Sequence, residues 1–213
     1  MGNRILFITL FLFVIVSGNA QELKNGGYMN FNEINLSKPT YDSSFKIIER
    51  TTGQIKAIGG NDYYIESEQV SKKIIKKEIW GVVSDNVLYL NGIPITGLMW
   101  YAKVEHYGKY CFLRPAYPSN PKIKEELGLN NKELGYMFGA VGGAIQGATL
   151  AMLRIPLIYE LETGNKMLLT DHNLSKLLEN HTELKNRFDK EVDKQNEDIL
   201  LKYLIELNEL VKN

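Results

Sequence analysis

The chain has 213 residues, with 25 basic and 25 acidic side chains, three histidines and one cysteine. This length suits one domain with a substantial core, and the balanced charge excludes nucleic-acid binding as a main role. A single cysteine cannot form an internal disulfide, so packing has to supply the stability.

Residues 1–20 have the pattern of a secretory signal peptide. Arg4 precedes an apolar run over residues 5–16, and small residues follow, with Gly18 and Ala20 at the two positions that a signal peptidase selects. A membrane-spanning helix needs about 20 apolar residues, so this shorter run favours a cleaved signal over an uncleaved anchor.

The expected cleavage lies between Ala20 and Gln21, which leaves a mature chain of residues 21–213. A bacterial lipoprotein needs a cysteine at the cleavage point, and the only cysteine is Cys111. We therefore expect an exported protein of the periplasm or the extracellular space that is not lipid-anchored.

The mature chain begins with a polar, irregular lead-in over residues 21–44, followed by a region of strands over residues 45–114. Short β-branched and aromatic runs separated by turn residues are typical of antiparallel strands. Two turn signals, at residues 84–86 and 107–108, predict hairpins. The predicted strands cover residues 45–49, 63–66, 74–83, 87–90, 99–105 and 109–113.

Three prolines end this region, and residues 122–132 then indicate a charged surface segment with a helical turn near residues 125–127. Residues 156–162 and 167–169 predict one more hairpin.

Residues 171–211 have the apolar spacing of three amphipathic helices. Thr170 or Asp171 is expected to cap the first and Thr182 the second, in which Leu184, Phe188 and Val192 recur at four-residue spacing. The sequence thus predicts a single α+β domain over residues 21–213. Its antiparallel, hairpin-rich sheet is covered by the C-terminal helices, and a glycine-rich apolar segment, residues 134–155, lies between them.

That segment places Gly135, Gly139, Gly143 and Gly147 at every fourth residue, on one face of a helix. Small residues at this spacing drive helix association in membranes, so one interpretation is a helix that associates with a membrane or oligomerises there. The other interpretation is a segment packed against the domain's own sheet. We favour packing, because a spanning helix in mid-domain would split the sheet.

Few residues suggest chemistry. His106 and Cys111 lie on opposite arms of one predicted hairpin, but nothing orients them as a thiol-imidazole pair, and a lone cysteine in a strand is usually buried. His172 and His181 have no zinc-helix spacing. We assign no catalytic residue, metal or cofactor from the sequence.

Aromatic side chains gather in the strand region and are the candidates for a binding surface. These are Trp80, Trp100, Tyr101, Tyr107 and Tyr110.

Several short motifs along the mature chain resemble an uncharacterised family of secreted proteins from the Bacteroidota, a domain of unknown function. The resemblance implies export and assigns no activity. The motifs are Gly27-Tyr28 with Phe31 and Pro39, Lys77-Glu78-Ile79-Trp80-Gly81, Leu88-Tyr89-Leu90-Asn91, Gly108-Lys109-Tyr110, residues 139–147, residues 159–164, and Leu169-Thr170 with Leu177-Leu178.

The sequence therefore predicts a non-enzymatic contact or binding module whose partner is an envelope protein, a glycan or a lipid. Two alternatives remain: a small-ligand carrier with an apolar cavity, and a membrane-associated glycine-zipper oligomer that uses residues 134–155. A deep pocket with convergent polar groups favours the carrier, and a flat aromatic face favours the contact module.

Overall fold

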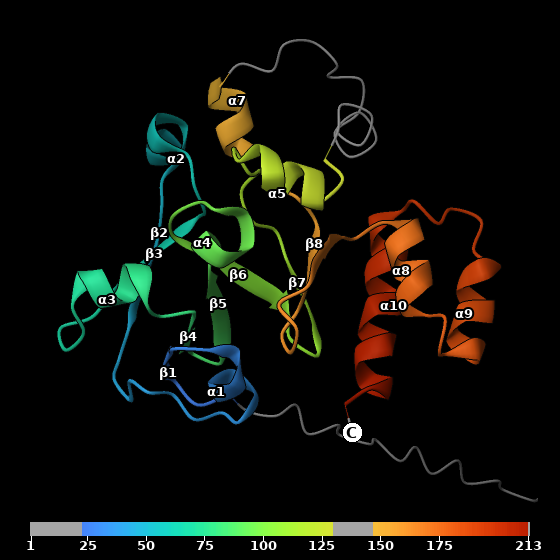
Figure 1. Cartoon of the computed structure of the whole chain (residues 1–213), viewed down its shortest axis with the longest axis horizontal. Helices are drawn as coiled ribbons and strands as arrows, with labels where there is room; N and C mark the ends of the chain where they lie inside the picture. The colour runs from blue at the N-terminus through green and yellow to red at the C-terminus, as the bar shows by residue number, and fades with distance from the viewer. Residues whose placement is uncertain (1–22, 130–146, 213) are drawn as a thin grey trace, which may run out of the picture.

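The computed structural model describes residues 23–129 and 147–212. Those residues form an open antiparallel sheet of nine strands and nine helices, which confirms the α+β class (Figure 1). The strands are β1 (Gly26–Tyr28), β2 (Lys46–Glu49), β3 (Tyr63–Glu66), β4 (Gly81–Ser84), β5 (Val87–Asn91), β6 (Tyr101–His106), β7 (Tyr110–Leu113), β8 (Leu157–Glu160) and β9 (Lys166–Leu168). The helices are α1 (Phe31–Asn35), α2 (Thr52–Ile58), α3 (Lys72–Lys77), α4 (Gly92–Thr96), α5 (Pro121–Glu126), α7 (Gly147–Met152), α8 (Asp171–Leu177), α9 (Thr182–Asp189) and α10 (Glu197–Leu210).

The sheet follows one path, β1-β4-β5-β6-β7-β8-β9, from which β3 and β2 branch. β5 pairs along one edge of β6, and the other edge is shared between two strands. β3 meets it through the single pair Tyr63 and Tyr101, and β7 pairs further along, at Val104 and His106. The ladder between β3 and β6 therefore ends at once, and β3 diverges from the main sheet.

The predicted hairpins are present. β4 and β5 are joined by Asp85 and Asn86, whose φ angles of 52° and 61° fit the tight turn that matches the twist of an antiparallel pair. β8 and β9 form the hairpin expected near residue 164, where Gly164 has a φ of 72°.

The predicted strand over residues 74–83 is wrong in its first half. The chain forms α3 there, with Ser71 as N-cap accepting a hydrogen bond from the Ile74 backbone N–H, and the strand starts only at Gly81. The adjacent β-branched residues Ile74 and Ile75 suggest a strand, but Ile75 is buried in the core and Ile74 only partly buried, which together with the cap favours a helical turn.

The lead-in over residues 21–44 is more ordered than expected, since it contains β1 and α1. α2 and α4 were not predicted from the sequence either. α2 begins at a capping box, in which Thr51 and Gln54 each accept a hydrogen bond from the other's backbone N–H.

The three C-terminal helices lie together on one side of the sheet, beside β7 and β8 (Figure 1). Thr170 caps α8, as predicted. Thr182 does not cap α9: His181 holds the N-cap position and makes no side-chain hydrogen bond there, and α9 ends at Asp189. Val192 lies beyond that end and is fully exposed, so the expected apolar stripe stops at Phe188.

The two faces of β7 and β8 belong to different cores. Cys111 and Leu113 pack with the residues of β4–β6, whereas Phe112 and Ile158 point the other way, into the C-terminal helices. Full burial of one such side chain contributes about 1.5–3 kcal/mol, so Phe112 and Ile158 anchor the helices to the sheet. The expected docking of the helices is thus confirmed.

A side chain of α10 completes the edge of β7. Asn208 accepts a hydrogen bond from the Tyr110 backbone N–H at 2.9 Å, and its amide donates to the Tyr110 carbonyl at 2.8 Å. The contact requires glycine at position 108, because a Cβ there would lie 2.5 Å from the Asn208 side chain. One amide side chain thus takes the place of a neighbouring strand.

Of the predicted glycine face, Gly135, Gly139 and Gly143 lie outside the described residues, and Gly147 is the first residue of α7. α7 lies next to α2 (Figure 1). α5 replaces the expected helical turn near residues 125–127, and Pro121, expected only to stop the sheet, is its first residue.

Candidate functional site

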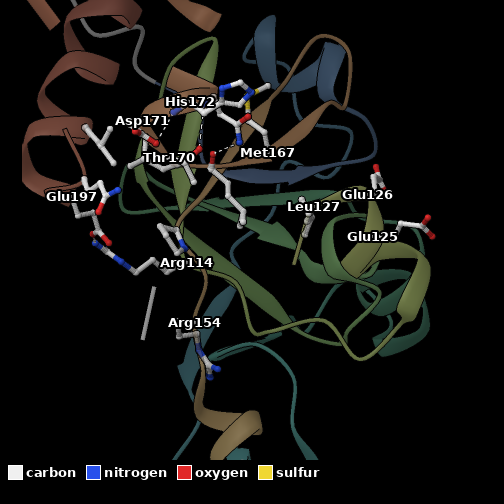
Figure 2. A pocket seen from close by; sticks show the side chains of 17 residues that line it. Arg114, Glu125, Glu126, Leu127, Arg154, Met167, Thr170, Asp171, His172 and Glu197 are labelled. Carbon is white, nitrogen blue, oxygen red and sulfur yellow. Dashed lines mark hydrogen bonds and ion pairs between the residues drawn. The ribbon is translucent and has the colours of Figure 1, made fainter. Parts of the chain in front are cut away.

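A cleft of about 760 Å³ lies between α5 and the C-terminal helices, over the end of β8 and β9 (Figure 2). This volume falls within the range of about 300–1,000 Å³ that is usual for small-molecule sites. The lining residues are Arg114, Glu125, Glu126, Leu127, Gly128, Arg154, Pro156, Met167, Leu168, Leu169, Thr170, Asp171, His172, Asn173, Gln195, Glu197 and Leu200.

The junction between β9 and α8 forms one wall, and local hydrogen bonds fix it. The Leu169 N–H donates to the Pro156 carbonyl at 2.9 Å, and the Asn173 N–H donates to the Thr170 hydroxyl at 3.2 Å. The Asn173 side chain also donates to the Leu168 carbonyl at 2.9 Å, which ties the end of β9 to α8.

The end of α5 forms the facing wall. Leu127 is buried in the main core and Gly128, with a φ of 68°, turns the chain away from the helix. Lys166 on β9 forms an ion pair with Glu126 at 3.2 Å, which joins this wall to the sheet.

Arg114 follows β7 and forms ion pairs with Glu105 on β6 and Glu197 on α10. Figure 2 shows Arg114 and Glu197 directed toward each other across one side of the cleft. The guanidinium also lies 4.8 Å from the centroid of the Phe112 ring. Arg114 thus links the sheet to the first turn of α10 at the cleft wall.

Arg154 lines the opposite end of the cleft and pairs with Asp62, with Nε 2.9 Å from the carboxylate. Its Nη1 also donates to the carbonyls of Ala151 and Leu153 at 3.0 and 2.8 Å. Both guanidiniums of the lining are therefore already matched by acceptors of the protein.

The carboxylates of the lining are not all matched. Glu126 and Glu197 form ion pairs, whereas Glu125 and Asp171 have no basic side chain within 4.0 Å among residues 23–129 and 147–212. The cleft therefore combines apolar surface from Leu127, Met167 and Leu200 with a rim that carries excess negative charge. Such a surface suits a ligand with an apolar body and a neutral or cationic polar end.

The histidines and the cysteine form no catalytic pair. The strand register sets His106 opposite Phe112, so His106 and Cys111 lie on opposite faces of the hairpin. Cys111 is buried, as expected, and burial raises the pKa of its thiol to about 12. His172 is exposed on the first turn of α8, and His181 lies at the start of α9.

The aromatic candidates are dispersed over the molecule. Trp80 and Tyr107 are each 36% exposed, and they line neither the cleft beside α5 nor a smaller cleft between β3, α3 and β6. Tyr110 is half-buried on β7 beside Asn208. Burial raises the pKa of Tyr107 to about 12.

Trp100 and Tyr101 do share a site, a second cleft of about 240 Å³ between β3, α3 and the start of β6. Tyr101 is 3% exposed, and its hydroxyl donates to the Ile75 carbonyl at 2.5 Å, so it supplies the floor and not an exposed platform. Trp100 is half-buried and lines the same cleft.

Neither cleft could be recognised as a single site from the sequence. The larger one brings together five separated segments, and the nearest sequence signals are the caps of α5, α8 and α10. The smaller one depends on the buried Asn61, which carries no signal in the sequence other than its place after Gly59-Gly60.

Within the described part of the chain, no group of three or more His, Cys, Asp or Glu side chains is placed to hold a metal ion. None of the helices described there is long and apolar enough to span a membrane.

The fold and the larger cleft together define an α+β protein with a ligand-sized cleft between its sheet and its C-terminal helices. The model of the family of unknown function DUF6563 matches residues 26–211, and the chain belongs to this family. No curated protein and no solved structure matches it.

Proposed function

We propose that this protein is an exported, non-enzymatic binding module of the periplasm or cell envelope, and that it takes its ligand into the cleft between α5 and the C-terminal helices. The observation that carries the proposal is the cleft itself: about 760 Å³, lined by apolar side chains together with charged and polar ones. Export rests on the signal-peptide pattern of residues 1–20.

The ligand is a small amphiphile that is neutral or cationic at its polar end. Apolar contact with Met167, Leu169 and Leu200 would hold its body. Asp171 would face its polar end, because the arginines of the lining are occupied by Asp62, Glu105 and Glu197. An anionic ligand would have to displace one of those carboxylates.

Native mass spectrometry of the mature protein purified from its own envelope tests the binding. We expect a bound small molecule in the wild type that is lost in Met167→Trp, because the indole fills the cleft. The matched control is Ile93→Trp, which adds the same side chain at an exposed position on α4. Retention of the ligand by Met167→Trp, or its loss from both variants, contradicts the proposed site.

Intact-mass measurement of the exported protein tests the location. We expect a mature chain that begins at Gln21. A species that retains Met1, or recovery of the protein from the cytoplasm alone, contradicts export.

A further inference from the structure

The cleft beneath Trp100 opens where β3 leaves the main sheet. Its volume of about 240 Å³ holds a single ring with a short substituent, and its wall is mostly apolar and aromatic. The lining residues are Tyr64, Ile65, Glu66, Lys72, Ile75, Lys76, Asn91, Met99, Trp100 and Tyr101.

Trp100 is held in a backbone conformation that bulky residues rarely adopt, with a φ of 70°. Such strain persists only when the surroundings impose it, and it concentrates at functional sites. Here the surroundings do impose it. The buried Asn61 side chain donates to the carbonyls of Met99 and Trp100 at 3.3 Å, and the Gly92 N–H donates to the Trp100 carbonyl at 2.8 Å.

The ring of Trp100 is fixed as firmly as its backbone. The Arg50 guanidinium lies 3.6 Å from the ring centroid and donates to the carbonyls of Gly59 and Asn61. Gly60 lies against the ring, where a Cβ would approach it to 2.4 Å. Trp100 is therefore a rigid platform and not a mobile surface side chain.

The floor of the cleft offers backbone hydrogen-bonding groups. The Arg50 N–H donates to the Asp62 carbonyl, so the backbone groups of Asp62 point toward β2. The backbone groups of alternate residues in a strand point to the same edge, so those of Tyr64 also point toward β2. Ile65 therefore faces the opposite side, beyond the point where the ladder with β6 ends at Tyr63. The Ile65 N–H and C=O therefore have no neighbouring strand to bond to among those described, and face the cleft instead.

The mouth of the cleft is positively charged. α3 carries four lysines in six residues, and Lys72 and Lys76 line the cleft. Among the residues that the structure describes, only Lys72 of these four has a carboxylate within 4.0 Å, that of Glu66 at 3.6 Å. Lys76 therefore supplies an uncompensated ammonium beside an apolar cavity.

We propose that this cleft is a second binding site, for an apolar ring that carries a carboxylate. The ring lies against Trp100, Tyr64 and Met99, and the carboxylate meets the Lys76 ammonium and the Ile65 N–H. The site is independent of the larger cleft, whose excess charge has the opposite sign. Two sources supply this chemistry: a free aromatic acid, and the C-terminal residue of a peptide that ends in an aromatic side chain.

Fluorescence of the mature Trp80→Phe protein tests the site, since Trp100 is then the only tryptophan of the mature chain. The probes are N-acetyl-phenylalanine, its uncharged amide, and an acetylated tripeptide that ends in phenylalanine. We expect at least one of the two acids to change the Trp100 emission and to bind about tenfold more tightly than the amide at low salt.

Lys76→Gln should abolish this preference for the acid, whereas Lys73→Gln, on the same helix but outside the cleft lining, should preserve it. Both lysines are exposed, so neither change threatens folding. Tighter binding of the tripeptide identifies a peptide C-terminus as the source, and tighter binding of the single residue identifies a free acid. An emission that neither acid changes, equal binding of acid and amide, or equal loss in both lysine variants overturns the proposal.

Discussion

The cleft beside α5 is joined across its walls by ion pairs between partly exposed side chains, whereas the cleft beneath Trp100 is fixed by buried polar groups. Arg114, which links the larger cleft to α10, has a side chain that is 35% exposed, and its partners Glu105 and Glu197 are 34% and 43% exposed. Asn61 and Arg50, which hold Trp100, are 1% and 5% exposed. The smaller cleft is therefore preorganised, and the larger one can adjust its rim at little energetic cost.

The largest expected effect comes from removing the clamp of the smaller cleft. Asn61→Ala leaves the Ala116 N–H and the Met99 and Trp100 carbonyls without their side-chain partner. Each unsatisfied buried group costs about 1–3 kcal/mol, and other bonds remain to both carbonyls, so we expect a loss of about 3 kcal/mol in the free energy of unfolding. Urea denaturation measures it.

The matched control is Asn180→Ala at an exposed position between α8 and α9, which should change the free energy of unfolding by less than about 0.5 kcal/mol. Similar losses in the two variants would show that the Asn61 bonds do not stabilise the fold.

An intermediate effect is expected from alkaline pH, through the core beneath the larger cleft. Cys111 packs in the same core as Leu127 and Leu168, which line that cleft. Burial raises the pKa of the thiol from 9.0 to about 12, so the unfolded chain releases this proton first. The stability that the buried, neutral thiol contributes is fully present below pH 9. It is lost as the pH rises above 9, and the free energy of unfolding falls by about 1 kcal/mol between pH 9 and 10.

Urea midpoints at pH 8, 9 and 10 measure this loss, and Cys111→Ala should reduce it. If the variant loses as much stability between pH 9 and 10 as the wild type does, other groups cause the loss.

The smallest effect is expected at the rim of the larger cleft. Arg114→Met keeps the apolar contact with Phe112 but removes both ion pairs. Partly exposed ion pairs often contribute only a few tenths of a kcal/mol each, and salt screens them, so the loss of both together should stay below about 1 kcal/mol and shrink further in concentrated salt. Thermal unfolding at low and high salt checks this. A larger loss, insensitive to salt, would make Arg114 a structural element comparable with Asn61.

The hairpins and the C-terminal helices could be predicted because their signals are local. Asp85 and Asn86 favour the left-handed turn on their own, and the apolar spacing of α10 produces a buried stripe on any sheet it packs against. α3 could not be predicted because two adjacent isoleucines fit both the helical and the strand pattern of apolar residues. Only the Ser71 cap and the position of Ile75 in the core favour the helix.

The clefts could not be predicted because they depend on contacts between distant segments. Asn61 bonds to Met99, Trp100 and Ala116, which lie 38, 39 and 55 residues further along the chain. Trp100 and Tyr101, two of the aromatic candidates, both line the smaller cleft, but no local pattern distinguishes the buried Tyr101 from the half-buried Trp100.

The bond between Tyr110 and Asn208 has a consequence for the order of synthesis, because it joins positions 98 residues apart. A ribosome completes β7 long before the last turn of α10 emerges, and the edge of β7 at Tyr110 has to wait for that turn. Contacts of such high sequence separation slow folding. A nascent chain arrested before Asn208 presents those backbone groups to any other strand, and an open edge of this kind is a template for aggregation.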